Sequence, residues 1–114
     1  MSNQASEKPI AQPYIAPGTL ERIARFNQVR NWDQFHNPKD LAIAISLEAA
    51  ELLECFQWSG QDLAGDGRRD RLLEETADVL IYALHLCQDL AVNPDEIINQ
   101  KLDRNEIKYP LKDM

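Results

Sequence analysis

Apolar residues recur along this chain at the three- and four-residue spacing of helices, not at the two-residue spacing of strands. Only the run DVLIYAL resembles a buried strand, and the helical pattern on both sides of it favours a helix there as well. The predicted fold class is therefore all-α, a four-helix-type bundle. The pattern predicts helices over about 19–31, 38–58, 68–90 and 94–106.

Local signals place the ends of these helices. Thr19 is expected to cap the first helix, and Asn37-Pro38 and Asn93-Pro94 to begin the second and fourth. Prolines before Thr19 and the polar character of the start predict an extended segment there. We expect three parts in the chain: a flexible arm over 1–18, a helical domain over 19–110 and a tail over 111–114.

The second predicted helix is apolar on more than one side. Leu41, Ile45 and Leu52 lie on one side, while Ile43 and Leu47 lie elsewhere around it. A helix with this distribution is typical of the centre of a bundle. Helices of this length leave more apolar surface than one short bundle covers, so the pattern predicts an oligomer.

Composition narrows the class of protein. The chain has 114 residues, 44% of them hydrophobic and 27% charged, which is typical of one folded domain. Its net charge of −7 argues against a nucleic-acid polymer as partner. No apolar run approaches the roughly 20 residues of a membrane span, and a secretory signal pattern is not seen. We expect a cytoplasmic protein without a membrane partner, in which Cys55 and Cys87 are buried free thiols.

Two pairs of carboxylates carry the candidate chemistry. Glu48 and Glu51 lie three residues apart on the second helix, and Glu75 and Asp78 lie three apart on the third. Residues at this spacing share a helix face, and a short loop favours antiparallel packing of the two helices. Four converging carboxylates repel one another unless they are protonated or bind a cation. A site of oxygen ligands suits Mg²⁺ or Mn²⁺.

Two other interpretations of these carboxylates remain open at this point. Acidic residues on amphipathic helices are most often solvated, and Glu54 and Glu74 fit that description. Di-iron bundles also gather carboxylates from facing helices, but they use Glu-x-x-His motifs. Neither Glu48 nor Glu75 is followed by such a histidine, and His85 lies two turns beyond Asp78. The oxygen-only set favours phosphate chemistry over redox chemistry.

The order of several motifs then resembles a known family. The run NWDQFHNPKDLAIAISLEAAELLECFQW, followed by EETADVLIYAL and KLDRNEIKYP, resembles the all-α nucleoside triphosphate pyrophosphohydrolases. Among these it is most similar to the MazG-like dCTP pyrophosphatases. The resemblance covers about residues 19–110. It implies Mg²⁺-dependent hydrolysis of a nucleotide between the α and β phosphates, giving a nucleoside monophosphate and pyrophosphate, as a house-cleaning activity.

The resemblance also implies roles for individual residues and a homotetramer built as a dimer of dimers. The metal ligands are Glu48, Glu51, Glu75 and Asp78, and Glu51 is the first choice as the base that activates water. Lys101 and Asn105 match positions near the phosphates, and Tyr82 faces the same groove. Residues of the base-and-sugar pocket are Trp32, Asp33, Gln34, Phe35, His36 and Trp58.

Several positions depart from the family pattern. Leu47, Ala49 and Ala50 stand where glycines are frequent, and Ile23 stands where a relative has a substrate-contacting histidine. Cytosine, adenine and broader deoxynucleotide use therefore remain open. His85 replaces a small residue, so it contacts either the groove or a neighbouring subunit.

Each functional interpretation also has a structural alternative. The tryptophans and Phe35 are also explained as core or interface aromatics, and Lys101 and Asn105 as solvated residues of a polar helix. The alternative function is a non-catalytic helical module that binds metal or a partner.

Overall fold

The computed structural model describes residues 15–35, 37–57 and 67–112. These residues form helices and no strands, which confirms the all-α class. Among these helices, none has both the length and the apolar character that crossing a bilayer requires. The elements are α1 (Pro17–Val29), the 3₁₀ helix η2 (Trp32–Phe35), α2 (Pro38–Glu54), α3 (Arg68–Asp89) and α4 (Pro94–Lys108).

Asparagine–proline pairs begin α2 and α4, as the sequence predicts. The side chain of Asn37 accepts a hydrogen bond from the backbone N–H of Asp40 at 2.9 Å, and Asn93 accepts from that of Asp95 at 2.9 Å. Each cap satisfies a backbone donor that the first turn of a helix leaves without a partner. The proline that follows each asparagine has its backbone angle already set for the first helical position.

Several helix ends differ from the prediction, by one to four residues. The first helix begins at Pro17 instead of Thr19, with Ala16 as a cap that makes no side-chain hydrogen bond. Proline is favoured at the first helical position, and this preference outweighs the capping potential of Thr19. Helix α2 ends at Glu54, and residues 55–57 continue in turns closed by shorter-range hydrogen bonds. Trp58, the predicted end, lies outside the described residues.

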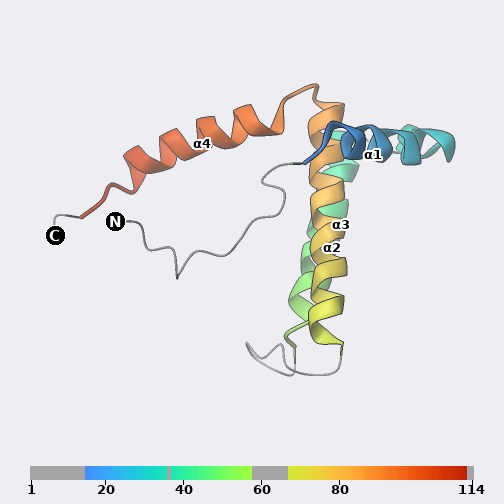
Figure 1. Ribbon diagram of the computed structural model, residues 1–114, viewed down its shortest axis with the longest axis horizontal. Coiled ribbons are helices and arrows are strands. Elements are labelled where there is room, and N and C mark those ends of the chain that lie inside the picture. Colours follow the sequence, from blue (N-terminus) through green and yellow to red (C-terminus); the bar gives the residue numbers. More distant parts are fainter. Residues whose placement is uncertain (1–14, 36, 58–66, 113–114) are drawn as a thin grey trace.

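Helices α2 and α3 lie side by side and antiparallel, and they form the centre of the molecule (Figure 1). An ion pair of 3.6 Å between Arg71 and Glu54 joins the end of α2 to the start of α3. Leu41 is fully buried, and Ile45 and Leu52 on the same side of α2 are half-buried. Ile43 and Leu47 are exposed, so the predicted division of α2 into a core side and other apolar sides is confirmed.

Helix α1 crosses the end of this pair and packs on α3 (Figure 1). Gln88 Nε2 donates a hydrogen bond to the backbone oxygen of Leu20 at 2.8 Å. Ile23 on α1 is buried, whereas Val29 at its end is exposed. This crossing closes one end of the α2–α3 pair and creates the walls of a cavity described below.

Helix α4 extends away from the other helices (Figure 1). The chain turns where α3 ends, and Ala91 adopts a left-handed conformation there, with φ of 54°. The backbone N–H of Val92 donates to the oxygen of Cys87 at 3.0 Å, and that of Ala91 donates to the oxygen of Gln88 at 3.1 Å. These two bonds form a Schellman motif, in which glycine is the usual left-handed residue. The bundle of a single chain thus consists of α1, α2 and α3, and α4 leaves it.

Candidate metal and nucleotide site

Three of the four predicted metal ligands come together between α2 and α3. Glu48, Glu51 and Glu75 each offer a carboxylate oxygen, and these oxygens lie within 4.8 Å of one another. Glu48 and Glu75 are half-buried, whereas Glu51 is exposed. The three-residue spacing places Glu48 and Glu51 on the same side of α2, and antiparallel packing brings Glu75 opposite to them.

Burial and mutual repulsion favour the protonated forms of these carboxyls. Burial raises the pKa of Glu48 to about 6, and the contact with Glu51 and the charges of Asp78 and Glu75 add to this rise. The pKa of Glu75 is also raised, by burial first and then by Glu51 and Asp78, while Arg71 opposes the rise. Oε2 of Glu48 and Oε2 of Glu75 are buried and have no hydrogen-bond partner among the described residues. Such a cluster of acceptors without donors fits a hard cation, which prefers carboxylate oxygens.

Asp78 lies outside this group of three oxygens. It follows Glu75 by one helical turn on α3 and lines the neighbouring cavity. Its charge raises the pKa of Glu48 and of Glu75, so it acts electrostatically on both sides of the cluster. The four carboxylates therefore form one acidic region, with Asp78 at the border between the cluster and the cavity.

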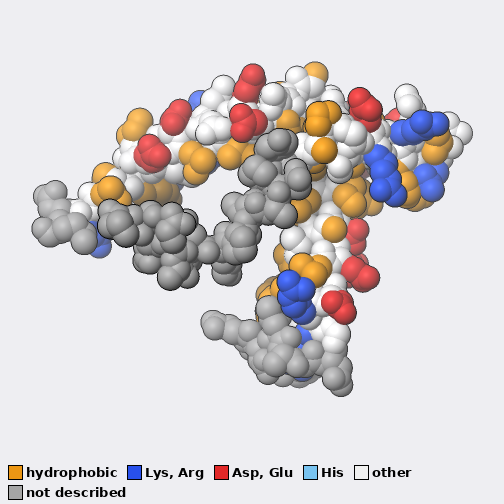
Figure 2. Space-filling view, viewed as in Figure 1, with side chains coloured by type: hydrophobic (Ala, Val, Ile, Leu, Met, Phe, Trp, Pro, Cys, Tyr) orange, Lys and Arg blue, Asp and Glu red, His pale blue; other side chains and the backbone are white. Residues whose placement is uncertain are grey.

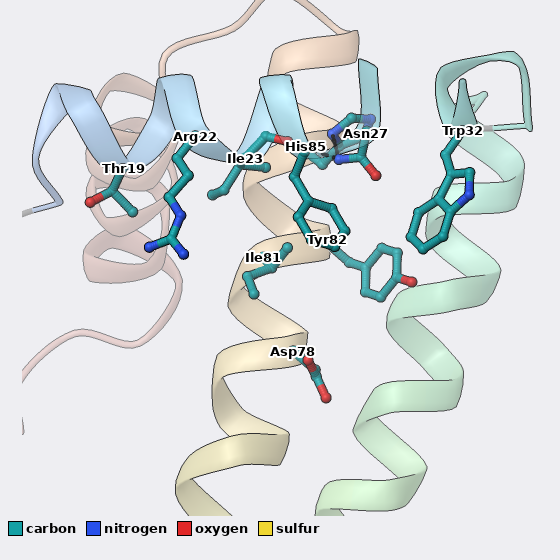
Figure 3. Close-up of a pocket in the computed structure, with 10 residues that line it drawn as sticks. Thr19, Arg22, Ile23, Asn27, Trp32, Asp78, Ile81, Tyr82 and His85 are labelled. Carbon is teal, nitrogen blue, oxygen red and sulfur yellow. Dashed lines mark hydrogen bonds between the residues drawn. The ribbon is translucent and has the colours of Figure 1, made fainter. Parts of the chain in front are cut away.

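The cavity, of about 440 Å³, opens beside the carboxylate cluster where α1, η2 and α3 meet (Figure 3). Its surface is mostly apolar, with charged and polar groups at defined places. This combination is typical of small-molecule sites. The lining residues are Thr19, Arg22, Ile23, Phe26 and Asn27 of α1, Trp32 of η2, and Asp78, Ile81, Tyr82 and His85 of α3.

Two of the predicted pocket residues, Trp32 and Tyr82, line this cavity. The ring of Trp32 meets that of Phe26 edge to face, with centroids 5.7 Å apart and planes at 73°. This aromatic contact holds the indole against α1. Burial raises the pKa of Tyr82, and the charges of Glu48 and Asp78 raise it further. The phenol therefore keeps its proton next to the acidic region.

The other predicted pocket residues lie elsewhere or outside the described part of the chain. Asp33 Oδ1 lies 3.8 Å from Nε2 of His85, next to a smaller cavity of about 230 Å³. Gln34 is exposed on η2. His36, Trp58 and the side chain of Phe35 lie outside the described residues.

Lys101 and Asn105 belong to α4, and this helix extends away from α2 and α3 (Figure 1). Lys101 is exposed and Asn105 is half-buried. The structure of one chain therefore does not bring these residues together with Glu48, Glu51 and Glu75.

One feature of the cavity was missed by the sequence analysis. Asn27 and His85 are both buried and hydrogen-bonded, with 3.1 Å between Nδ2 and Nδ1. His85 was noted because it shares a face of α3 with Asp78, but Asn27 was not singled out. The available signal was its position four residues after Ile23, on the apolar side of α1.

The fold and the carboxylate cluster define a class of helical protein with an acidic cluster between two antiparallel helices. The MazG-like family model matches residues 43–114, and the chain belongs to this family. This match includes all four predicted metal ligands.

Known proteins with related sequences carry the name dCTP pyrophosphatase 1. The chain is 37% identical to that of Mus musculus over 102 residues, which cover 82% of this chain and 60% of the mouse protein. It is 38% identical to that of Homo sapiens over 101 residues, covering 81% and 59% of the two chains. The chain thus spans about 60% of the length of these curated relatives.

A solved structure is similar over a larger share of both chains. A crystal structure of a pyrophosphatase from Archaeoglobus fulgidus shares 39% sequence identity with this chain and superposes with a TM-score of 0.77. The similarity covers 91% of this chain and 100% of the archaeal one. The helical arrangement described above is therefore that of a solved relative.

Proposed function

We propose that this chain hydrolyses nucleoside triphosphates, with dCTP-like deoxynucleotides preferred, between the α and β phosphates in the presence of Mg²⁺. The products are a nucleoside monophosphate and pyrophosphate. One observation carries the proposal: the carboxylate cluster and the aromatic cavity lie side by side along α3. A site that binds a whole nucleotide needs its phosphate-binding part and its base-binding part next to each other in this way. Relatives named dCTP pyrophosphatase support the choice of nucleotide.

Glu48, Glu51, Glu75 and Asp78 would hold the cation. The buried Oε2 atoms of Glu48 and Glu75, which lack hydrogen-bond partners among the described residues, are the observation that fits a metal. Bound Mg²⁺ supplies charge neutralisation for the phosphates and a more acidic water. Mn²⁺ has the same preference for oxygen ligands.

Glu51 is the proposed base. It is the exposed member of the cluster, so a water at the α-phosphorus reaches its carboxylate without entering the core. A carboxylate oxygen of Glu51 takes a proton from this water as the new oxygen–phosphorus bond forms. The bond from the α-phosphorus to the bridging oxygen breaks, and pyrophosphate leaves. Tyr82, which stays protonated, lines the cavity beside Asp78.

The cavity takes the base and sugar. Trp32 forms an aromatic wall held in place by Phe26, and rings of this kind stack on nucleobases. Asp33, Gln34, Phe35, His36 and Trp58 remain predicted members of this pocket.

An oligomer, predicted to be a homotetramer, completes the proposal. The radius of gyration of the chain is 17.5 Å, whereas a compact domain of this size has about 13 Å. Figure 2 shows hydrophobic side chains exposed along α4. Ile98 and Leu102 of this helix are exposed. Packing of α4 on a second copy would bury this surface and bring Lys101 and Asn105 to the carboxylates of that copy.

The test is a panel of ribo- and deoxynucleoside triphosphates incubated with the protein and Mg²⁺, with pyrophosphate measured. We expect release from dCTP and loss of at least about a hundredfold in rate for Glu51→Gln, the usual range for removal of a general base. Glu54→Gln, an exposed carboxylate in a surface ion pair, is the matched control and keeps activity. Absence of pyrophosphate with every nucleotide would overturn the proposal and favour a non-catalytic module.

A further inference from the structure

Two buried polar side chains face each other at the inner end of the cavity (Figure 3). Asn27 of α1 and His85 of α3 each keep only 7% of their surface exposed. Buried polar groups are costly unless they are hydrogen-bonded, and a pair of them in an apolar cavity requires an explanation. Both residues line the cavity next to Trp32 and Tyr82.

The orientation of the Asn27 amide follows from its neighbours. Nδ2 lies 2.9 Å from the backbone oxygen of Ile23, an atom that only accepts hydrogen bonds. The amide nitrogen must therefore face α1, because the amide oxygen would be repelled there. The same nitrogen lies 3.1 Å from Nδ1 of His85, so Nδ1 accepts and the proton of the neutral imidazole lies on Nε2. The Oδ1 atom of Asp33, 3.8 Å from Nε2, is on the side that this tautomer favours.

These two contacts use both hydrogens of the Asn27 amide. The remaining polar atom is Oδ1, which makes no hydrogen bond with the described residues. Figure 3 shows this oxygen directed to the side of Trp32, away from the backbone of α1. The cavity thus presents a hydrogen-bond acceptor in a fixed position, Oδ1 of Asn27. The amide nitrogen of the same side chain is already engaged by Ile23 and His85.

We propose that Asn27 Oδ1 selects nucleotides whose base carries the amino group of cytosine C4 or adenine C6, with His85 as a positioning residue; this inference rests on the proposed function. Cytosine and adenine present an amino donor on the base edge, whereas thymine and uracil present a carbonyl acceptor at the corresponding place. If Asn27 Oδ1 faces the carbonyl oxygen of thymine or uracil, both buried acceptors are left without a hydrogen bond. Such a mismatch lowers the affinity for a nucleotide more than the mere absence of a contact does.

The spacing along α3 agrees with this assignment. Glu75, Asp78, Tyr82 and His85 follow one another at intervals that keep them on one face of the helix. At 1.5 Å per residue, His85 lies about 15 Å along the axis from Glu75. A nucleotide with its phosphates at the carboxylates would extend along this face, with its base at Asn27.

The experiment compares dCTP with dUTP. The base of dCTP has an amino group at the position where the base of dUTP has a carbonyl oxygen. We expect the wild-type chain to favour dCTP in kcat/KM by at least about tenfold, and Asn27→Ala to reduce this ratio to about two or less. Asn99→Ala is the matched control, since Asn99 Nδ2 makes the same type of hydrogen bond, to the oxygen of Asp95 at 2.8 Å, on α4. It should leave the ratio unchanged. His85→Leu should lower the same ratio, because Asn27 then loses the contact that fixes its amide.

Binding of dCMP and dUMP, measured by calorimetry, gives a second readout that does not require hydrolysis. The same preference for the amino-bearing nucleotide, lost in Asn27→Ala, is expected. Equal affinity of the wild-type chain for dCMP and dUMP, or a ratio that Asn27→Ala leaves unchanged, would overturn the inference while the pyrophosphatase activity stands. Absence of hydrolysis with retained selective binding would instead overturn the proposed function alone. Addition of dATP and dAMP shows whether the site also admits adenine.

Discussion

Glu48 of α2 and Glu75 of α3 bring carboxylate oxygens within 4.8 Å of each other across the helix pair. Each has a buried Oε2 without a hydrogen-bond partner in the part of the chain described here. Two buried carboxylates in contact destabilise a folded chain unless a proton or a cation lies between them. The predictions on metal and pH follow from this pair.

Addition of Mg²⁺ should stabilise the protein. A ligand at about a hundred times its Kd adds about 2.7 kcal/mol to the free energy of unfolding, which raises Tm by several degrees, as thermal unfolding would show. Glu48→Gln should remove most of this response, and Glu54→Gln should keep it, because Glu54 pairs with Arg71 at the surface. Identical Mg²⁺ responses in the two variants would contradict the assignment.

The stability of the metal-free protein should fall as the pH rises. The pKa of Glu48 is raised to about 6 from the ordinary 4.5, so the unfolded chain loses this proton first. Between these values the folded chain binds more protons, and the free energy of unfolding decreases with pH. The contribution of Glu48 is fully present below pH 4.5 and lost above pH 6. Urea titrations across this range should show the decrease, and Glu48→Gln should flatten it.

Replacement of Trp32 by alanine should weaken nucleotide binding more than folding. The indole is partly exposed and lines the cavity, and loss of a stacking aromatic costs about 1–3 kcal/mol. A rise in KM of roughly tenfold is expected, with a change in Tm of only a few degrees. A large loss of stability with unchanged KM would favour a purely structural role for this aromatic residue.

Two inactive variants should restore activity when mixed, if α4 of one copy serves the carboxylates of another. Lys101→Ala and Glu51→Gln each remove one part of a composite site. Subunit exchange would form sites with an intact Glu51 from one chain and Lys101 of the partner subunit. Pyrophosphate release should therefore exceed that of either variant alone. Mixtures without recovery, after exchange is verified by mass spectrometry, would contradict a site composed of Glu51 and Lys101 from two copies.

The core depends on Leu41. Its side chain is fully buried between the helices, and Leu41→Ala should lower the free energy of unfolding by about 2–5 kcal/mol through lost burial and the cavity left behind. Leu111, with 98% of its surface exposed, offers the matched control. Leu111→Ala should leave the denaturant midpoint within experimental error of the wild type.

Features that depend on residues close together in the sequence could be predicted from it. The starts of α2 and α4 depend on Asn37-Pro38 and Asn93-Pro94, where cap and proline are adjacent. The carboxylate cluster was readable because the spacing within each helix fixes a face. The 3₁₀ helix η2 was not predicted, since four residues carry too little periodicity.

Relationships between distant residues were not readable in the same way. Asn27 and His85 are 58 residues apart, and their contact exists only because α1 crosses α3 at one particular height. The departure of α4 was missed for a different reason. Hydrophobic spacing gives the apolar side of a helix, but the direction in which it leaves depends on the backbone angles of the connection before it, among them the left-handed φ of Ala91.

The backbone angle of Ala91 restricts the conformation of the connection between α3 and α4. A left-handed conformation costs a residue with a side chain about 1–2 kcal/mol compared with glycine. Ala91→Gly should therefore raise stability slightly and give this connection more conformational freedom. An alanine at this place restricts the alternatives open to the backbone, and α4 keeps one direction. An assembly built on α4, as proposed above, would therefore start from a helix whose direction is already restricted within the single chain.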